Sequence, residues 1–154
     1  MGKVLMVANC AGIAKAAQVA PCNSVSIESL AALMVNAYDG TVDWEDGDDA
    51  AVAEQEIRAT LDGKYGLFLS AASGVIVDEV GNPISALFVS NLEGLATIIF
   101  VYTSKKAGGR GEASKLIRNA GYLLNEMGFE EVSLFVTDEN PARSLYERLG
   151  FTEK

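Results

Sequence analysis

The stretch T-I-I-F-V-Y-T-S-K-K-A-G-G-R-G-E-A-S-K-L-I-R-N-A-G-Y-L-L, from Thr97 to Leu124, determines the predicted fold. It begins with an apolar run of β-forming residues, continues into a basic, glycine-rich turn and ends in an amphipathic helix. Backbone N–H groups at a helix start lack intrahelical partners, and the helix dipole adds positive charge there. We therefore expect this turn to hold the pyrophosphate of a nucleotide-containing cofactor, although an ordinary solvated turn can have the same composition.

The sequence predicts helices and strands on both sides of this stretch. Apolar residues at helical spacing predict a helix from Ile27 to Tyr38, capped by Ser24 or Ser26, and a second helix over 50–61, capped by Asp46 or Asp48. A last helix is expected to begin at Asn140-Pro141 and to end at Gly150. Strands are predicted over residues 3–8, 67–69, 75–78, 84–89, 95–102 and 132–137.

This order of elements predicts a single α+β domain over residues 1–154. Strands come first in a run and then alternate with helices. A central mixed, mostly antiparallel sheet flanked by helices follows, with a parallel crossover through the helix after the glycine turn.

Composition and charge exclude several classes of function. The net charge of −9 disfavours a nucleic-acid partner. No apolar run is long enough to cross a membrane, and the N-terminus is a poor signal peptide, so we expect a cytoplasmic protein. Cys10 and Cys22 are expected to be reduced thiols. The absence of histidine excludes Ser-His-Asp and Cys-His catalysis and the usual zinc sites, so no metal is expected.

The glycine turn fits neither common phosphate-binding fingerprint. A Walker A loop is absent, and so is G-x-G-x-x-G after an early strand. The pattern is instead a basic residue followed by x-x-G-x-G, at Lys106, Gly109 and Gly111. Lys105, Lys106 and Arg110 gather positive charge in an otherwise acidic chain, which favours an anion at this position.

The same residues resemble the coenzyme A loop of the GCN5-related N-acetyltransferases, or GNATs. That family has V-x4-[Arg/Gln]-x-x-G-x-[Gly/Ala], and here Val101 begins the pattern and Lys106 replaces the usual Arg or Gln. The sequence D-E-N-P-A-R-S-L-Y-E-R-L-G-F, at residues 138–151, resembles the second signature of the family. The two motifs and the residues between them cover about residues 97–151.

Two departures from the family pattern concern the C-terminal part of the chain. Asn140 is one residue closer to Tyr146 than is common in the family. The chain also stops at Lys154, where family members run on into a final strand. That strand is expected to be missing, short or supplied by a partner subunit, as in a homodimer.

The resemblance implies an acetyltransferase that moves an acetyl group from acetyl coenzyme A to an amine by direct attack in a ternary complex. It implies that Tyr146 protonates the leaving thiolate, whereas spacing alone favours a core aromatic residue. We hypothesise that Glu93 is the general base, with Glu79 as the other candidate; both also fit solvated turn carboxylates. The cofactor-binding residues that the resemblance implies are Ile99, Phe100, Val101, Lys106, Ala107, Gly108, Gly109, Arg110, Gly111, Glu112 and Asn140.

The acceptor is less defined by the sequence. The acidic stretch at 43–49, around Trp44, could attract a cationic amine on a small molecule, a peptide or a protein, or could be a solvated loop. An alternative function is a degenerate GNAT domain that binds acyl coenzyme A as a sensor or subunit without turnover.

Overall fold

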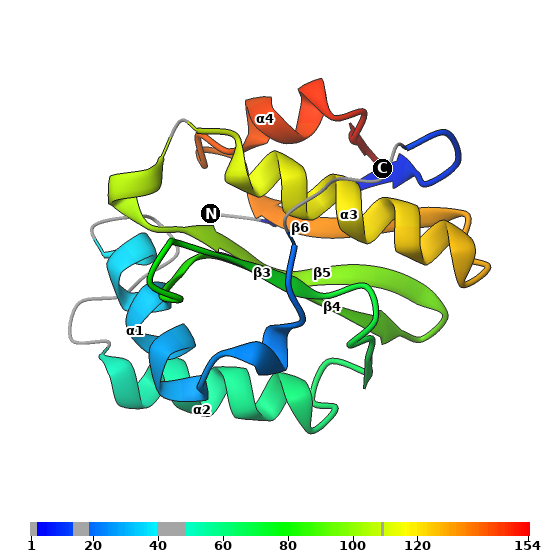
Figure 1. The fold of residues 1–154 in the computed structure, drawn as a ribbon. Helices are drawn as coiled ribbons and strands as arrows, with labels where there is room; N and C mark the ends of the chain where they lie inside the picture. The colour runs from blue at the N-terminus through cyan, green and yellow to red at the C-terminus, as the bar shows by residue number, and fades with distance from the viewer. Residues whose placement is uncertain (1–2, 14–18, 40–48, 109) are drawn as a thin grey trace.

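The computed structural model of the chain describes residues 3–13, 19–39, 49–108 and 110–154. The C-terminus lies in the upper half of the view in Figure 1. The elements in chain order are β1 (Lys3–Asn9), η1 (Cys22–Ser24), α1 (Ile27–Tyr38), α2 (Ala50–Leu61), β2 (Leu67–Phe68), β3 (Gly74–Val77), β4 (Pro83–Leu92), β5 (Leu95–Thr103), η2 (Lys105–Ala107), α3 (Glu112–Glu126), β6 (Glu131–Thr137), α4 (Arg143–Arg148) and β7 (Thr152–Glu153).

The strands form one mixed sheet, as the sequence predicts. Its order in the described residues is β2-β4-β5-β6-β1-β7, and β3 pairs with β4 along the same edge as β2. Among the strands that the structure describes, only β5 and β6 are parallel, because α3 crosses over between them; the other pairs are antiparallel. The predicted α+β class with a mostly antiparallel sheet is confirmed.

Helices cover both faces of this sheet (Figure 1). The alternation of side chains along β4 assigns Leu87 and Val89 to a core beneath α3 and α4. Ala86 and Phe88 face the opposite core, against α1 and α2. The glycine turn and the last helix therefore belong to one layer, and the first two helices to the other.

The N-terminal strand completes the sheet beside β6. All seven residues of β1 pair with β6, from Lys3 opposite Thr137 to Asn9 opposite Glu131. The strand β7 then pairs with only Met6 and Val7 of β1. Of the alternatives for the final strand, the short one is correct, and β6 has its edge covered by a strand of its own chain.

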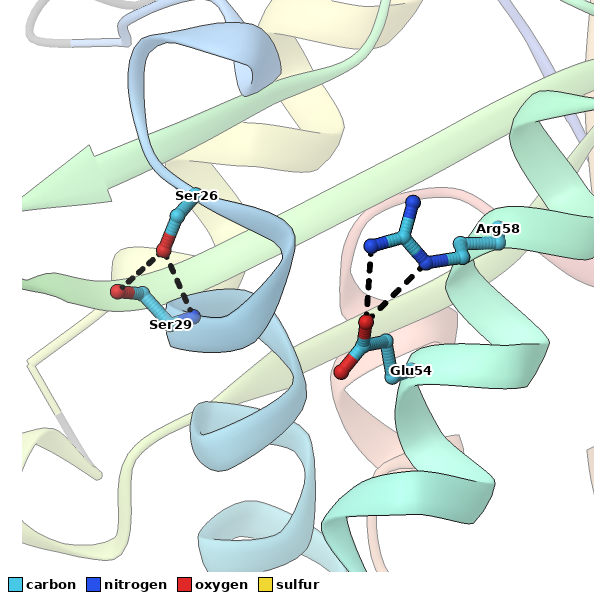
Figure 2. A network of polar contacts seen from close by, with 4 residues as sticks. All are labelled: Ser26, Ser29, Glu54 and Arg58. Carbon is cyan, nitrogen blue, oxygen red and sulfur yellow. Dashed lines mark hydrogen bonds and ion pairs between the residues drawn. The ribbon is translucent and has the colours of Figure 1, made fainter.

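Side-chain caps start the first two helices. The Ser26 hydroxyl accepts a hydrogen bond of 3.0 Å from the Ser29 backbone N–H and lies 2.9 Å from the Ser29 hydroxyl (Figure 2). The cap of α2 is Asp49, whose carboxylate accepts from the backbone N–H groups of Ala51 and Val52. This corrects the predicted cap at 46 or 48, two positions that lie outside the described residues.

An ion pair supports α2 on its exposed side. The Arg58 guanidinium donates two hydrogen bonds to one Glu54 carboxylate oxygen, at 2.8 and 3.1 Å, one turn apart (Figure 2). Such i,i+4 pairs add a few tenths of a kcal/mol, about 0.3–0.5, to an exposed helix.

The last helix begins later than predicted. Asn140 caps a turn, because its side-chain oxygen accepts from the Ala142 backbone N–H at 2.9 Å, but the helix α4 starts at Arg143. Pro141 thus lies in the turn before the helix and not at its first position.

The helix α3 is covered on more sides than its apolar stripe predicts. Glu112 and Asn119, which lie off the apolar stripe of the helix, are 8% and 6% exposed. The chain after β1 crosses this layer: Ile13 lies against Gly121, and Ala20 forms an isolated β-bridge with Val75. Helical periodicity does not report contacts of this kind between segments far apart in the sequence.

The two cysteines are free and buried, which agrees with the expected reduced thiols. Burial, with a smaller effect of the nearby Glu131 carboxylate, raises the pKa of the Cys10 thiol to about 11. Among the helices in the described residues, none is long and apolar enough to span a bilayer.

Two glycines with the same backbone requirement allow a direct test of packing beside β2. Gly66 and Gly81 both have positive φ, at +99° and +90°, so alanine costs about 1–2 kcal/mol at either. A Cβ on Gly66 would also lie 2.1 Å from the Asn91 carbonyl oxygen, whereas one on Gly81 meets nothing within 4 Å. Urea unfolding should show Gly66→Ala less stable than Gly81→Ala by about 1–3 kcal/mol. Equal losses would contradict the close approach of Gly66 to β4.

Candidate active site

Two neighbouring strands separate in the middle of the sheet. The parallel pairing of β5 with β6 covers only residues 96–98 and 132–134. Both strands continue, β5 to Thr103 and β6 to Thr137, but they no longer pair with each other. A gap edged by two backbones therefore opens between the C-terminal halves of β5 and β6.

A β-bulge lies where the strands begin to separate. Phe88 is opposite Phe100 and Val89 is opposite Ile98, so Ile99 is an extra residue in β5. The bulge reverses the alternation, because Ile98 and Val101, three residues apart, both pack into the core beneath α3. The predicted cofactor residues Ile99, Phe100 and Val101 form the part of β5 that borders the gap.

The hydrogen-bonding pattern shows which backbone groups face the gap. The Ser104 N–H donates to the Ile84 carbonyl at 2.8 Å, so this opposite pair is a hydrogen-bonded one. By alternation, the backbone N–H and C=O groups of Phe100 and Tyr102 also point toward β4. Those of Val101 and Thr103 point toward the gap. The Tyr38 hydroxyl agrees with this assignment, because it donates to the Val101 carbonyl at 3.4 Å, so that carbonyl is accessible to a group outside β4.

The glycine turn begins with a residue that braces α1. The Lys105 backbone N–H donates to the Asn36 side chain at 3.0 Å, and its ammonium donates to the Asp39 carbonyl at 2.6 Å. Lys106 and Arg110 are exposed and make no ion pair with any residue that the structure describes. Two of the three cations in the turn are thus available to an anion.

The start of α3 is open above its first turn. Gly111 is the N-cap, in the left-handed region at φ +80°, and provides no side-chain cap. The first helical hydrogen bond runs from the Lys115 N–H to the Gly111 carbonyl, so the amides of residues 112–114 have no partner inside the helix. A Cβ at Gly111 would meet nothing within 4 Å, which leaves space for an anion.

The remaining loop residues have clear local roles. Ala107 is buried and closes the turn of η2. Gly108 has φ −59°, which any residue adopts, and Gly109 lies outside the described residues. The Glu112 carboxylate pairs with the Lys115 ammonium at 3.3 Å, which offsets its negative charge next to the site.

Tyr146 and Asn140 lie on the β6 side of the gap. Tyr146 is 8% exposed, packs against Phe151 at a ring distance of 6.0 Å, and belongs to the same core as Val101. Asn140 holds the turn between β6 and α4. Sequence reasoning missed Arg143, whose guanidinium pairs with Asp138 and Glu153 and ties this turn to β7.

The structure does not bring Glu93 to the gap. Glu93 is exposed and, with Gly94, forms the tight turn between β4 and β5, at φ +54° and +92°. This hairpin is at the end of β5 where pairing with β6 begins, eight residues before Val101, or roughly 26 Å along a strand. The positive φ of Glu93 fits a two-residue turn. The distance of Glu93 from the gap argues against a role as the general base.

A family model described as "Acetyltransferase (GNAT) domain" matches residues 66–153, more than half of the chain. The chain belongs to the GNAT family. The match begins just before β2 and includes the bulged strand, the open start of α3 and Tyr146. No protein in a search of curated proteins matches the chain.

Solved structures with the same fold include other GNAT proteins. A GCN5-related N-acetyltransferase from Sphaerobacter thermophilus has a TM-score of 0.72 at 17% identity, over 99% of this chain and 48% of that one. A GNAT-family acetyltransferase from Novosphingobium aromaticivorans has 0.63 at 19% identity, over 100% of this chain and 61% of that one. An aminoglycoside 6'-N-acetyltransferase from Acinetobacter haemolyticus has 0.65 at 19% identity, over 88% and 91%. The chain therefore spans about half to three fifths of the first two structures, and these similarities support the fold.

Amide hydrogen exchange can test the orientation of β5. The amides of Val101 and Thr103 should exchange faster than those of Phe100 and Tyr102, because only the latter pair donates to β4. NMR can measure the exchange rates of all four amides, and Phe100 and Tyr102 serve as controls within the same strand. Equal protection along residues 100–103 would mean that the gap edge is paired after all.

Proposed function

We propose that residues 1–154 act as a single GNAT domain that transfers an acetyl group from acetyl coenzyme A to an amine, by direct attack in a ternary complex. The observation that carries this proposal is the separation of β5 from β6 beside the open N-terminus of α3. The gap between β5 and β6 suits an extended chain with amide groups, and the N-terminus of α3 suits a phosphate group.

The described residues fit this cofactor. The gap-facing N–H and C=O of Val101 would pair with the amides of the pantetheine arm as an added strand does. The amides at the start of α3, with Lys106 and Arg110, would hold the pyrophosphate. When bound, acetyl coenzyme A supplies an acetyl thioester as the activated donor.

Tyr146 is the proposed general acid. Its phenol O–H carries a proton that it can give to a departing thiolate sulfur. Direct attack needs no nucleophilic residue, which suits a chain without histidine. With Glu93 distant from the gap, we infer that the amine proton leaves to water.

The acceptor would approach from the face of α1 and α2, near the C-terminal end of β6. Phe135 points to this face and is 52% exposed, and the nearby Thr137 hydroxyl is buried without a partner in the described residues. A net charge of −9 attracts cationic amines, as small molecules or on peptides. The similar structure of an aminoglycoside acetyltransferase makes polyamine-like acceptors the first to test.

Two arginines on the same helix layer provide a test of cofactor binding. Arg110→Ala should weaken the binding of acetyl coenzyme A several-fold and reduce its salt dependence, because a cation near the pyrophosphate is lost. Arg118→Ala, two turns further along and also exposed, should bind like the wild type. Isothermal titration at two salt concentrations measures both. Equal affinities in the two variants would place the pyrophosphate elsewhere.

Tyrosine substitutions test the chemistry in the same way. Tyr146→Phe should lower kcat by about 10²-fold or more against a responsive amine, with little change in the KM for acetyl coenzyme A. Tyr122→Phe, on α3, is the matched control and should retain full turnover. A Tyr146→Phe enzyme with unchanged kcat would rule out the general-acid role.

The position of Glu93 also favours a second candidate, a GNAT domain that binds acyl coenzyme A without turnover. The two functions separate in one experiment. Thermal stabilisation by acetyl coenzyme A without acetylation of any amine in a broad panel would support the sensor, whereas turnover would exclude it.

A further inference from the structure

A second cavity, of about 780 Å³, lies at the β3 edge of the sheet. Its walls come from the chain segment that leads into α1, the end of α2, β2, the loop before β3 and the middle of α3. Figure 1 shows the segment before α1, in blue, descending past β3 from the layer of α3 to the layer of α1. The crossing segment therefore encloses space between the two layers.

This cavity is separate from the gap between β5 and β6. Asn119, which lines it, is seven residues after the first residue of α3, or about 10 Å along the helix. Leu30 also lines it and is eight residues before Tyr38, about 12 Å from the end of α1 that reaches Val101. The cavity is lined by the N-terminal part of α1 and the middle of α3, away from the helix ends that border the gap.

The walls are apolar and uncharged. Among the described residues, no Asp, Glu, Lys or Arg lines the cavity. Its apolar lining includes Val19, Ile27, Leu30, Leu61, Phe68 and Phe88. A pocket without a counter-charge disfavours an ionised ligand and favours a neutral one. The volume is within the range of about 300–1,000 Å³ that is typical of small-molecule sites.

One polar side chain in the walls is little exposed and makes no hydrogen bond with the described residues. Asn119 is 6% exposed, yet its side-chain amide makes no hydrogen bond with the residues that the structure describes. The hydroxyls of Ser26 and Ser73 are already used, in the cap of α1 and in bonds to Leu69 and Val89. A ligand with a hydrogen-bonding group could therefore pair with the Asn119 amide without breaking a bond to the described residues.

We propose that this cavity is a second binding site, for a neutral, largely apolar small molecule with one hydrogen-bonding group that meets the Asn119 amide. The site differs from the proposed acetyl coenzyme A and acceptor sites in position and in chemistry. It takes an uncharged ligand, whereas they take an anion and an amine.

Binding of N-phenyl-1-naphthylamine tests the proposal. This probe is neutral and apolar, carries one N–H donor, and fluoresces more strongly in apolar surroundings. We expect saturable binding of one probe per chain, not displaced by saturating acetyl coenzyme A. Asn119→Ala should weaken binding several-fold, because it removes the hydrogen-bond acceptor and leaves the space open.

A blocking variant keeps the test independent of Asn119. Ala71 is exposed at the cavity wall, so Ala71→Trp should reduce probe affinity at least tenfold without disturbing the core. Ala32→Trp, at an exposed position of α1 outside the cavity, is the control and should bind normally. Non-saturable binding, or full affinity in Ala71→Trp, would overturn the proposal. Displacement by acetyl coenzyme A would show that the site belongs to the cofactor cleft.

Discussion

The interruption of pairing between β5 and β6 is the constraint on which the proposed site depends. Three residue pairs join the two strands before the Ile99 bulge, and none joins them after it. Had β5 continued without the extra residue, Val101 would face α1 and α2, and its polar groups would point toward β4. One inserted residue thus gives the strand a free backbone edge within an otherwise paired sheet.

Pairing on the outer edges keeps the gap open. β5 is held to β4 by eight residue pairs, and β6 is held to β1 by seven. Closing the gap would require one of these ladders to break, so the separation is a property of the folded chain. A ligand that inserts there does not have to open the sheet first, which lowers the free-energy cost of binding.

The sequence predicts those features that arise from local patterns. The strand before the glycine turn, the helix after it, the Ser26 cap and the glycine at Gly111 are all visible in short stretches. The position of β1 between β6 and β7 cannot be read from a short stretch, because pairing between distant parts of a chain leaves no local signal. The apolar sequence of β1 predicts a strand and gives no partner.

The burial of Asn119 and the position of Glu93 were missed for related reasons. Asn119 lies off the apolar stripe of α3, so helical periodicity does not predict its burial. The sequence places Glu93 after a central strand but cannot say which end of the sheet the hairpin occupies. Its positive φ, which a type I′ turn requires, becomes evident only from the backbone.

The electrostatics of the glycine turn follow from the meeting of two helix ends. The C-terminus of α1 carries partial negative charge, and the N-terminus of α3 carries partial positive charge. Lys105 donates to the Asp39 carbonyl and so neutralises the negative end. In a chain with net charge −9, this leaves the amides of α3, Lys106 and Arg110 as a positive region beside the gap. Lys105 is therefore the lysine that is least available to an anion. It offsets the negative C-terminal end of α1, which would otherwise repel an anion bound at the start of α3.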